Sequence, residues 1–280
     1  MTAHQIRTAS VIYYSQTGHT RQYARYVAHI LKRSGLEVDT YDILTTNPKD
    51  VPGADLVVVG VPVFYYDVPE NAIVWLRRLP RIDGAFGAAF AVFGGEGDNQ
   101  HNTACSLLDL LGEKGAKPVS LSTLSSMSTF APTWSAGNEK RVLAYSHLPD
   151  DEIYSQVAAF ADDALKRARE GRTIGPKKRP SLTNLLRGRI SVKGTKLLIT
   201  GHGIDKGTCI DCGKCEKTCP VGAVDQKNHS VDTKRCIACF GCVNNCPTGA
   251  MQMKFVGKPV SGFTQFKKKH SIGVNPPPMD

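Results

Sequence analysis

Apolar side chains recur along the first 170 residues in two alternating patterns. Short runs rich in β-branched and aromatic residues indicate buried strands, whereas apolar positions three or four residues apart indicate helices with one buried face. The predicted strands cover residues 8–14, 35–42, 56–61, 85–93 and 119–124. One predicted helix begins after residue 20, and three others cover about 69–79, 101–115 and 151–170. Because the two types alternate with short connections, the pattern predicts an α/β fold with a doubly wound, five-stranded parallel sheet.

The loop from Ser15 to Thr20 joins the first predicted strand to the first predicted helix and reads Ser-Gln-Thr-Gly-His-Thr. Hydroxyl and backbone N–H groups converge at such a loop, and the helix dipole favours an anion there. The loop has neither the Gly-Lys-Ser/Thr of a Walker motif nor the GxGxxG of a dinucleotide fold. It predicts a phosphate-binding site.

Eight of the nine cysteines form two copies of the run Cys-x-x-Cys-x-x-Cys-x-x-x-Cys-Pro, which begin at Cys209 and Cys236. This run holds [4Fe–4S] clusters in bacterial ferredoxins, with the fourth cysteine directed to the other cluster. Structural zinc usually takes two CxxC pairs, and a disulfide framework belongs to secreted chains. We therefore assign one cluster to Cys209, Cys212, Cys215 and Cys246, and the second to Cys219, Cys236, Cys239 and Cys242.

The net charge of +10 is distributed unevenly, because eleven Lys and Arg residues lie between Lys166 and Lys196 and only Glu170 opposes them. Such a stretch can attract an acidic protein, anionic lipid or nucleic acid, or it can serve as a solvated linker. No nucleic-acid-binding motif accompanies the charge. The N-terminus lacks a signal-peptide pattern, and no apolar run is long enough to span a membrane. Because the thiolate ligands of the clusters need a reducing compartment, we expect a cytoplasmic protein.

Residues 8–170, with the Ser-x-Thr-Gly-x-Thr loop after the first strand, resemble a flavodoxin. The whole chain resembles the fused flavodoxin–ferredoxin proteins of anaerobic bacteria and archaea. The resemblance implies the sheet order 2-1-3-4-5, with FMN bound between the first and third strands, followed by a small α+β ferredoxin domain with two [4Fe–4S] clusters. Oligomeric state does not follow from the sequence.

The same resemblance implies three flavin-binding loops. The first would wrap the FMN phosphate, the second would cover the flavin ring, and the third would approach the ring edge through glycines. Their residues are Ser15, Gln16, Thr17, Gly18, His19 and Thr20; then Pro62, Val63, Phe64 and Tyr65; then Phe93, Gly94, Gly95 and Asn99. Either Tyr65 or Phe64 would stack on the ring, while packing in the core is the alternative for each.

The expected domains are a flavin domain over 1–171, a basic linker over 172–200, a ferredoxin domain over 201–256 and a loosely held tail over 257–280. Apolar side chains at Leu182, Leu185, Leu186, Ile190 and 197–199 could dock the linker on either domain or lay it on a membrane. Cys105, outside both cysteine runs, is expected to be a small buried hydrophobic residue.

Together these parts favour an electron-transfer protein that passes electrons between two clusters and FMN and on to a partner redox enzyme in anaerobic metabolism. The partner would present an acidic docking surface. The alternative is a flavin-dependent reductase of a small substrate or quinone, with the clusters as its electron feed. A redox sensor or nucleic-acid-binding protein is a third class. Because we find no Ser/His/Asp set, paired carboxylates or pyridine-nucleotide fingerprint, the sequence favours the carrier.

Overall fold

The computed structural model describes residues 4–95, 99–180 and 191–279. The chain divides into two compact units. The first unit comprises residues 1–126, 148–185 and 275–280, and the second comprises residues 127–147 and 186–274. Among the described residues, no helix combines the length and the apolar character needed to cross a membrane.

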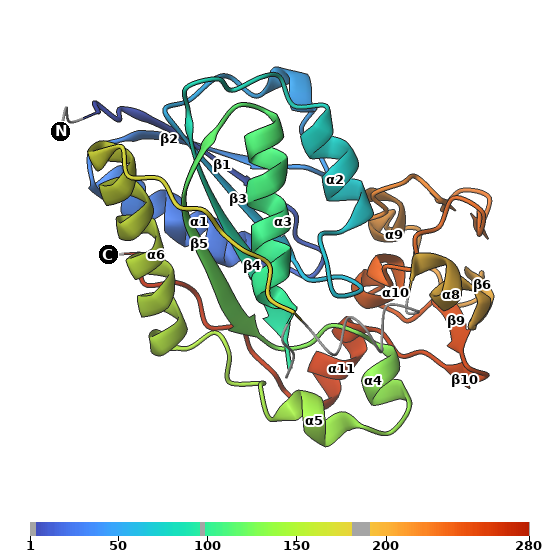
Figure 1. The fold of residues 1–280 in the computed structure, drawn as a ribbon. Coiled ribbons are helices and arrows are strands. Elements are labelled where there is room, and N and C mark those ends of the chain that lie inside the picture. The colour runs from blue at the N-terminus through green and yellow to red at the C-terminus, as the bar shows by residue number, and fades with distance from the viewer. Residues whose placement is uncertain (1–3, 96–98, 181–190, 280) are drawn as a thin grey trace. The chain divides into compact units, whose positions relative to one another are not determined.

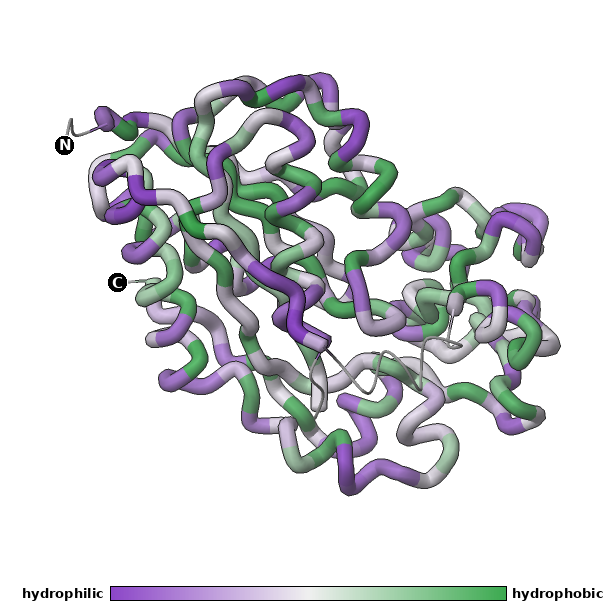
Figure 2. Tube along the Cα trace, viewed as in Figure 1, coloured by the Kyte–Doolittle hydropathy of each residue, from purple (hydrophilic) through white to green (hydrophobic). Residues whose placement is uncertain are grey.

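The first unit is built on a five-stranded sheet of order β2-β1-β3-β4-β5, in which every neighbouring pair is parallel. The strands are β1 (Thr8–Tyr13), β2 (Glu37–Asp42), β3 (Leu56–Pro62), β4 (Phe86–Gly94) and β5 (Lys117–Ser126). The predicted doubly wound fold and its strand order are confirmed. β3 and β4 are buried on both faces over most of their length, and their tube is largely hydrophobic (Figure 2), as expected of central parallel strands.

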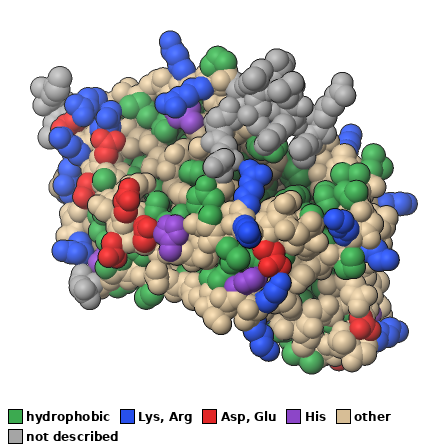
Figure 3. Space-filling view, turned by 90° about the horizontal axis from the view of Figure 1, so that it is seen from below, with side chains coloured by type: hydrophobic (Ala, Val, Ile, Leu, Met, Phe, Trp, Pro, Cys, Tyr) green, Lys and Arg blue, Asp and Glu red, His purple; other side chains and the backbone are tan. Residues whose placement is uncertain are grey.

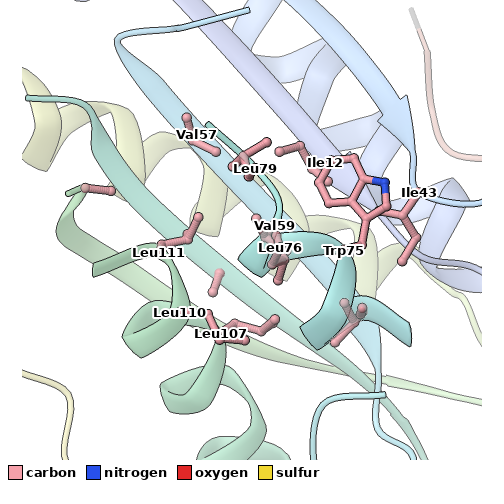
Figure 4. Close-up of a cluster of buried hydrophobic side chains, with 14 of the residues drawn as sticks. Ile12, Ile43, Val57, Val59, Trp75, Leu76, Leu79, Leu107, Leu110 and Leu111 are labelled. Carbon is pink, nitrogen blue, oxygen red and sulfur yellow. The ribbon is translucent and has the colours of Figure 1, made fainter. Parts of the chain in front are cut away.

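Helices cover both faces of this sheet (Figure 1). One face carries α1 (His19–Arg33) and α6 (Asp151–Glu170), and the other carries α2 (Glu70–Arg77) and α3 (Gln100–Glu113); the short 3₁₀ helix η1 covers Pro48–Asp50. Figure 4 shows how Trp75 and Leu76 of α2 and Leu107 and Leu111 of α3 meet strand residues such as Val59 in one hydrophobic core. This core fixes the ends of β1, β3 and β4, from which the predicted flavin loops extend.

Residues 127–147 group with the second compact unit, whereas we expected a flavin domain that runs without a break over 1–171. They form α4 (Pro132–Ser135) and α5 (Glu139–Leu143) in the second unit. Trp134 ties residues 127–147 to the second unit, because its side chain is 3% exposed and its ring centroid lies 4.7 Å from that of Phe266. Its indole N–H also donates to the Ser261 carbonyl at 2.8 Å. These contacts join segments more than a hundred residues apart in the sequence.

The second unit is a small α+β domain, as predicted. Its three-stranded antiparallel sheet has the order β10-β9-β6, and β7 pairs with β8. The elements are α8 (Val192–Leu197), β6 (Ile199–Ile204), α9 (Lys214–Lys217), β7 (Val224–Asp225), β8 (Ser230–Val231), α10 (Gly241–Asn245), β9 (Met251–Phe255), β10 (Lys258–Pro259) and α11 (Phe263–Lys269).

The expectation of a loosely held tail over 257–280 is wrong for most of that segment. Helix α11 packs Phe263 and Phe266 into the core of the second unit, where they are 3% and 2% exposed. Asn275 then returns to the first unit, where its Nδ2 donates to the Pro149 carbonyl at 2.9 Å and its carbonyl accepts from Tyr154 Oη at 2.6 Å. Burial of apolar side chains and pairing of backbone groups hold this segment in place.

The expected linker over 172–200 also differs from the structure at both ends. Residues 172–180 lie along the first unit, where Ile174 N–H donates to the Pro118 carbonyl at 2.8 Å and Arg179 N–H donates to Asn102 Oδ1 at 2.7 Å. Residues 192–200 form α8 and the start of β6. The apolar positions Leu182, Leu185, Leu186 and Ile190 lie outside the described residues.

Candidate functional sites

The Ser15–Thr20 loop lies between the end of β1 and the first turn of α1, as the sequence predicted for a phosphate site. Gly18 caps the helix with a φ of 106°, a left-handed conformation that favours glycine. Its N–H donates to Ser15 Oγ at 3.1 Å, which curls the loop around the helix N-terminus. The first N–H groups of a helix have no acceptor within the helix, so this end of α1 offers donors to an anion.

The other side chains of this loop are held close to the helix. Thr17 Oγ1 lies 3.5 Å from His19 Nδ1, and Gln16, His19 and Thr20 are buried. Arg21, which sequence reasoning missed, lies against the loop: a Cβ atom added at Gly18 would be 3.6 Å from its guanidinium. Its position one residue after the Ser-x-Thr-Gly-x-Thr motif was the signal that could have identified this cation. The loop therefore combines hydroxyls, backbone donors and a positive charge.

The loop after β3 closes on itself in a two-residue turn. Phe64 N–H donates to the Asp67 carbonyl at 3.0 Å, and Asp67 N–H donates to the Phe64 carbonyl at 2.9 Å. Tyr65 and Tyr66 occupy the turn with φ values of 48° and 66°, which are strained for side chains of this size. Phe64 packs against the core, with its ring centroid 5.9 Å from that of Tyr14. Of the two residues proposed to stack on flavin, Phe64 is half-buried against the core and Tyr65 lies in the turn. Pro62 and Val63 are half-buried at the strand end.

The loop after β4 begins at Phe93, Gly94 and Gly95 and re-enters the described chain at Asn99. Asn99 is 2% exposed, and in the described part of the chain neither its Oδ1 nor its Nδ2 has a hydrogen-bond partner. A buried amide without a partner is costly, and a bound polar ring edge would satisfy it. The strained tyrosine turn, the Gly18 loop and the Asn99 amide are therefore chemically suited to a phosphorylated flavin.

The eight cysteines of the two runs gather into two groups of four. In the first cysteine group, Cys209, Cys212, Cys215 and Cys246 line one small cavity together with Ile204, Gln226 and Met251. In the second cysteine group, the Cys219, Cys236 and Cys239 thiols are close enough to Cys242 to act on its pKa. Each group takes three cysteines from one run and one from the other. These are the groups that the sequence assigned, and their ligation of iron stays a prediction.

Left-handed backbone recurs at matching positions of the two runs and shapes both groups. Asp211 and Gly213 in the first run have φ values of 52° and 65°, and Ala238 and Phe240 in the second have values of 53° and 61°. Left-handed residues that alternate with residues of other conformation turn successive backbone N–H groups toward a common centre. Accordingly, Ala238 N–H donates to Cys236 Sγ at 3.3 Å, and Ala223 N–H donates to Cys219 Sγ at 3.1 Å.

Burial governs the electrostatics of the thiols. Burial raises the pKa of Cys239 to about 12, and the neighbouring Cys236 and Cys219 add to the effect. Burial likewise raises the pKa of Cys242 and Cys215. For Cys246, burial opposes the change, but hydrogen bonds from Met251 and Thr248 lower its pKa. Without a metal, thiols with a raised pKa stay protonated, and iron would displace their protons on binding, so the donor sets are compatible with iron–sulfur clusters.

Two further side chains bear on the cysteines. His202 of β6, which sequence reasoning missed, places Nε2 3.4 Å from Cys242 Sγ, and burial lowers its pKa to about 4. No pattern in the sequence points to this contact. Cys105 is 1% exposed, its Sγ lies 3.5 Å from His101 Nε2, and burial raises its pKa. Cys105 is thus a buried residue apart from both groups, as expected.

Two parts of the chain match models of known protein families. Residues 11–140 match the family model of flavodoxin, and residues 202–247 match that of a 4Fe-4S dicluster domain. The chain joins a flavodoxin domain to a 4Fe-4S dicluster domain. The flavodoxin domain implies FMN, and the dicluster domain implies two [4Fe–4S] clusters. The chain is therefore an electron-transfer protein that combines flavin and iron–sulfur centres.

Known relatives match the flavodoxin domain. A flavodoxin of Clostridium saccharobutylicum is 24% identical over 142 residues, which cover 50% of this chain and 82% of the relative. Among solved structures, the flavodoxin of Streptococcus pneumoniae TIGR4 has a TM-score of 0.45 and 18% identity, covering 57% of this chain and 99% of its own. Flavodoxin 1 from Bacillus cereus has a TM-score of 0.43 and 17% identity, and the match covers 57% of this chain and 97% of the Bacillus flavodoxin.

Proposed function

We propose that this protein is an electron carrier that exchanges electrons between its two clusters and FMN, and passes them to or from a partner redox enzyme in anaerobic metabolism. FMN takes up one or two electrons, whereas each [4Fe–4S] cluster takes up one. The observation that carries the proposal is the presence, in one chain, of a phosphate loop suited to FMN and two complete groups of four cysteines. A chain with both kinds of centre can convert between one-electron and two-electron transfer.

The structure supports a specific task for each set of residues. The Ser15–Thr20 loop and the end of α1 would bind the FMN phosphate, and the turn at Tyr65 and Tyr66 would cover the ring. The cysteine groups would hold the clusters, with N–H···S hydrogen bonds that adjust their potentials. Cys212 is exposed, so oxygen can reach the first cysteine group, which favours an oxygen-poor setting.

The test is electron exchange within anaerobically purified holoprotein. A redox titration followed by optical and EPR spectra would order the three centres, and flash photoreduction would then measure their re-equilibration. We expect exchange between clusters and FMN with a rate constant that does not depend on protein concentration. A rate proportional to concentration would contradict a carrier that works within one chain.

A second measurement separates the carrier from a reductase. The reduced protein is mixed with small acceptors, including a naphthoquinone, and the oxidation rate is followed as the acceptor concentration rises. A carrier without a substrate site gives rates that rise linearly with acceptor. Saturation, with competition by a redox-inert quinone analogue, would instead identify a flavin-dependent reductase.

A further inference from the structure

The positive charge of the protein belongs to its iron–sulfur unit. The second unit carries 17 Lys and Arg residues against 6 Asp and Glu residues, whereas the first carries 18 against 19. The net charges are therefore +11 and −1, which together give the +10 of the whole chain. Seven of the eleven Lys and Arg residues of the basic stretch noted in the sequence lie in the first unit, so that stretch is not the source of the asymmetry. A charged partner is steered by the field of the unit that it approaches.

Within that unit, the charge is concentrated on one group of elements. Helix α8 and the strands β6, β9 and β10 contain Lys193, Lys196, Lys254 and Lys258 and no acidic residue. By contrast, residues 205–229, which surround most of the first cysteine group, contain four lysines and four carboxylates. Figure 3 shows Lys and Arg side chains exposed among hydrophobic ones on the face that it draws. The two cysteine groups thus lie in unlike electrostatic surroundings.

Exposed apolar side chains lie among these lysines. Leu197 is 85% exposed, Leu198 is 45% exposed and Val256 is 63% exposed. They are neighbours, because Val256 N–H donates to the Leu198 carbonyl at 2.9 Å. We call the four lysines and these three apolar residues the lysine face. An apolar centre with a charged rim is the usual anatomy of a protein interface.

Val256 has a backbone conformation that is unfavourable for a β-branched side chain. It lies with Gly257 in the tight turn between β9 and β10, at a φ of 50°. Left-handed backbone is a genuine outlier for a β-branched residue, and Asn or Gly is the ordinary choice in such a turn. The exposed valine therefore costs stability and gains no buried contact in exchange. Strain of this kind is concentrated at functional positions.

The α8 end of the lysine face lies beside the second cysteine group. Lys196 Nζ donates to the Lys234 carbonyl at 2.8 Å, two residues before Cys236, and its charge acts on the Cys236 thiol. Strand β6 also carries His202, in contact with Cys242. A protein that covers this face would therefore bring its own redox centre close to the second cluster. An anionic membrane would match the charge but would have no need of this position.

We propose that the lysine face docks an acidic electron-transfer protein, and that one electron passes between that protein and the cluster of the second cysteine group. The inference rests on the proposed carrier function. No bond forms or breaks in this step; the reduced centre of one protein is oxidised as the other is reduced. The lysine face has seven residues, fewer than the roughly 20–30 that each side of a standard stable interface contains. A small contact of this kind suits a short-lived complex, as electron-transfer partners usually form.

The experiment uses holoprotein and, as a probe, an acidic [2Fe–2S] ferredoxin, with the bimolecular electron-transfer rate measured by stopped flow over a range of salt. Lys254→Ser with Lys258→Ser should lower the rate about tenfold at low salt and flatten its salt dependence. Lys227→Ser with Lys268→Ser removes the same charge from exposed positions elsewhere on the unit and should leave the rate within about twofold of wild type. Equal losses in the two double variants, or none in either, would overturn the proposal.

Val256→Asn gives a sharper test, because fold and docking should respond in opposite directions. Asn favours the left-handed turn, so the unit should become more stable, while loss of the apolar centre should slow electron exchange with the ferredoxin. Unchanged exchange would count against docking at this face. Binding to phosphatidylserine vesicles that is lost in Lys254→Ser/Lys258→Ser, with no effect on the ferredoxin rate, would assign the face to a membrane instead. Exchange within one chain should persist in every variant; its failure would concern the carrier function and not the face.

Discussion

His202 and Cys242 are in contact, with the imidazole Nε2 3.4 Å from the Cys242 sulfur. The two residues are 40 positions apart, on β6 and α10. Within the second cysteine group, the other sulfur contacts described above come from backbone N–H groups, so His202 adds a side-chain contact to that group. A hydrogen bond donated to a ligand sulfur stabilises the more negative, reduced cluster and raises its potential.

We therefore expect His202→Leu to lower the potential of the second cluster, measured by EPR-monitored redox titration. His202→Gln, which keeps an N–H donor, should restore much of the wild-type potential. The first cluster serves as an internal reference and should not shift. An equal change in Gln and Leu variants would indicate that His202 only fills space.

The crossed cysteine groups predict a specific pattern of damage. Cys219→Ser should impair the cluster of Cys236, Cys239 and Cys242, and spare the cluster that depends on its sequence neighbours Cys212 and Cys215. Iron and sulfide analysis with EPR of anaerobic protein would measure this. Loss of the other cluster would contradict the grouping. Cys105→Ser, matched in chemistry but in the other compact unit, should leave the iron content unchanged.

The phosphate loop predicts a change in FMN affinity without a change for riboflavin. A hydrogen bond to a charged group contributes ~1.5–3 kcal/mol, so Thr17→Ala or Thr20→Ala should weaken FMN binding roughly ten- to a hundred-fold. Riboflavin, which lacks the phosphate, should bind both variants and wild type equally in a fluorescence titration of apoprotein. FAD should bind wild type poorly, because the loop curls around a terminal phosphate. Equal losses for riboflavin would indicate a general disturbance of the loop.

Helix α11 is expected to be essential to the iron–sulfur unit. Phe266→Ala removes a buried ring packed on Trp134 and should cost about 3–5 kcal/mol, with easier loss of cluster absorbance in urea. Lys268→Ala, an exposed change on the same helix, should cost less than about 0.5 kcal/mol. If both variants behaved alike, the segment would act as a tail after all.

Asp55 is expected to link stability of the flavodoxin domain to pH. Burial alone would raise the pKa of its carboxyl, but its Oδ2 accepts hydrogen bonds from Arg7 N–H at 2.8 Å and Thr8 N–H at 3.0 Å, and its pKa is lowered overall. A lowered folded-state pKa gives stability that is present above the ordinary value of about 3.9 and is lost as pH falls through the folded value. Asp55→Asn should therefore reduce stability at pH 7, by about 1 kcal/mol.

The measurement for Asp55 is urea unfolding of wild type and variant at several pH values, followed by flavin fluorescence. The difference between the two proteins should be constant from pH 7 down to about pH 5 and should shrink below about pH 4. A difference that stays constant into the acid range would show that the carboxylate charge is not involved.

The sequence by itself determined the features that depend on short stretches of chain. The strand and helix periods of 8–170 indicate the elements of the sheet, the Ser15–Thr20 loop indicates a phosphate site, and the cysteine spacing indicates three ligands of each cluster, because each pattern places its groups within a few residues of one another. The fourth ligand of each cluster comes from the other run, and the known cluster-binding motif supplied that assignment.

Tertiary structure alone decided the features that join distant segments. Trp134 meets Phe266, so residues 127–147 belong to the iron–sulfur unit and the expected tail becomes a core helix. Phe64 packs against Tyr14 while Tyr65 lies in the turn, although both are aromatic neighbours in sequence. His202 and Cys242 likewise meet only when β6 packs beside the second cysteine group. An apolar side chain in the sequence predicts burial, but the residues that it contacts depend on how the whole chain packs.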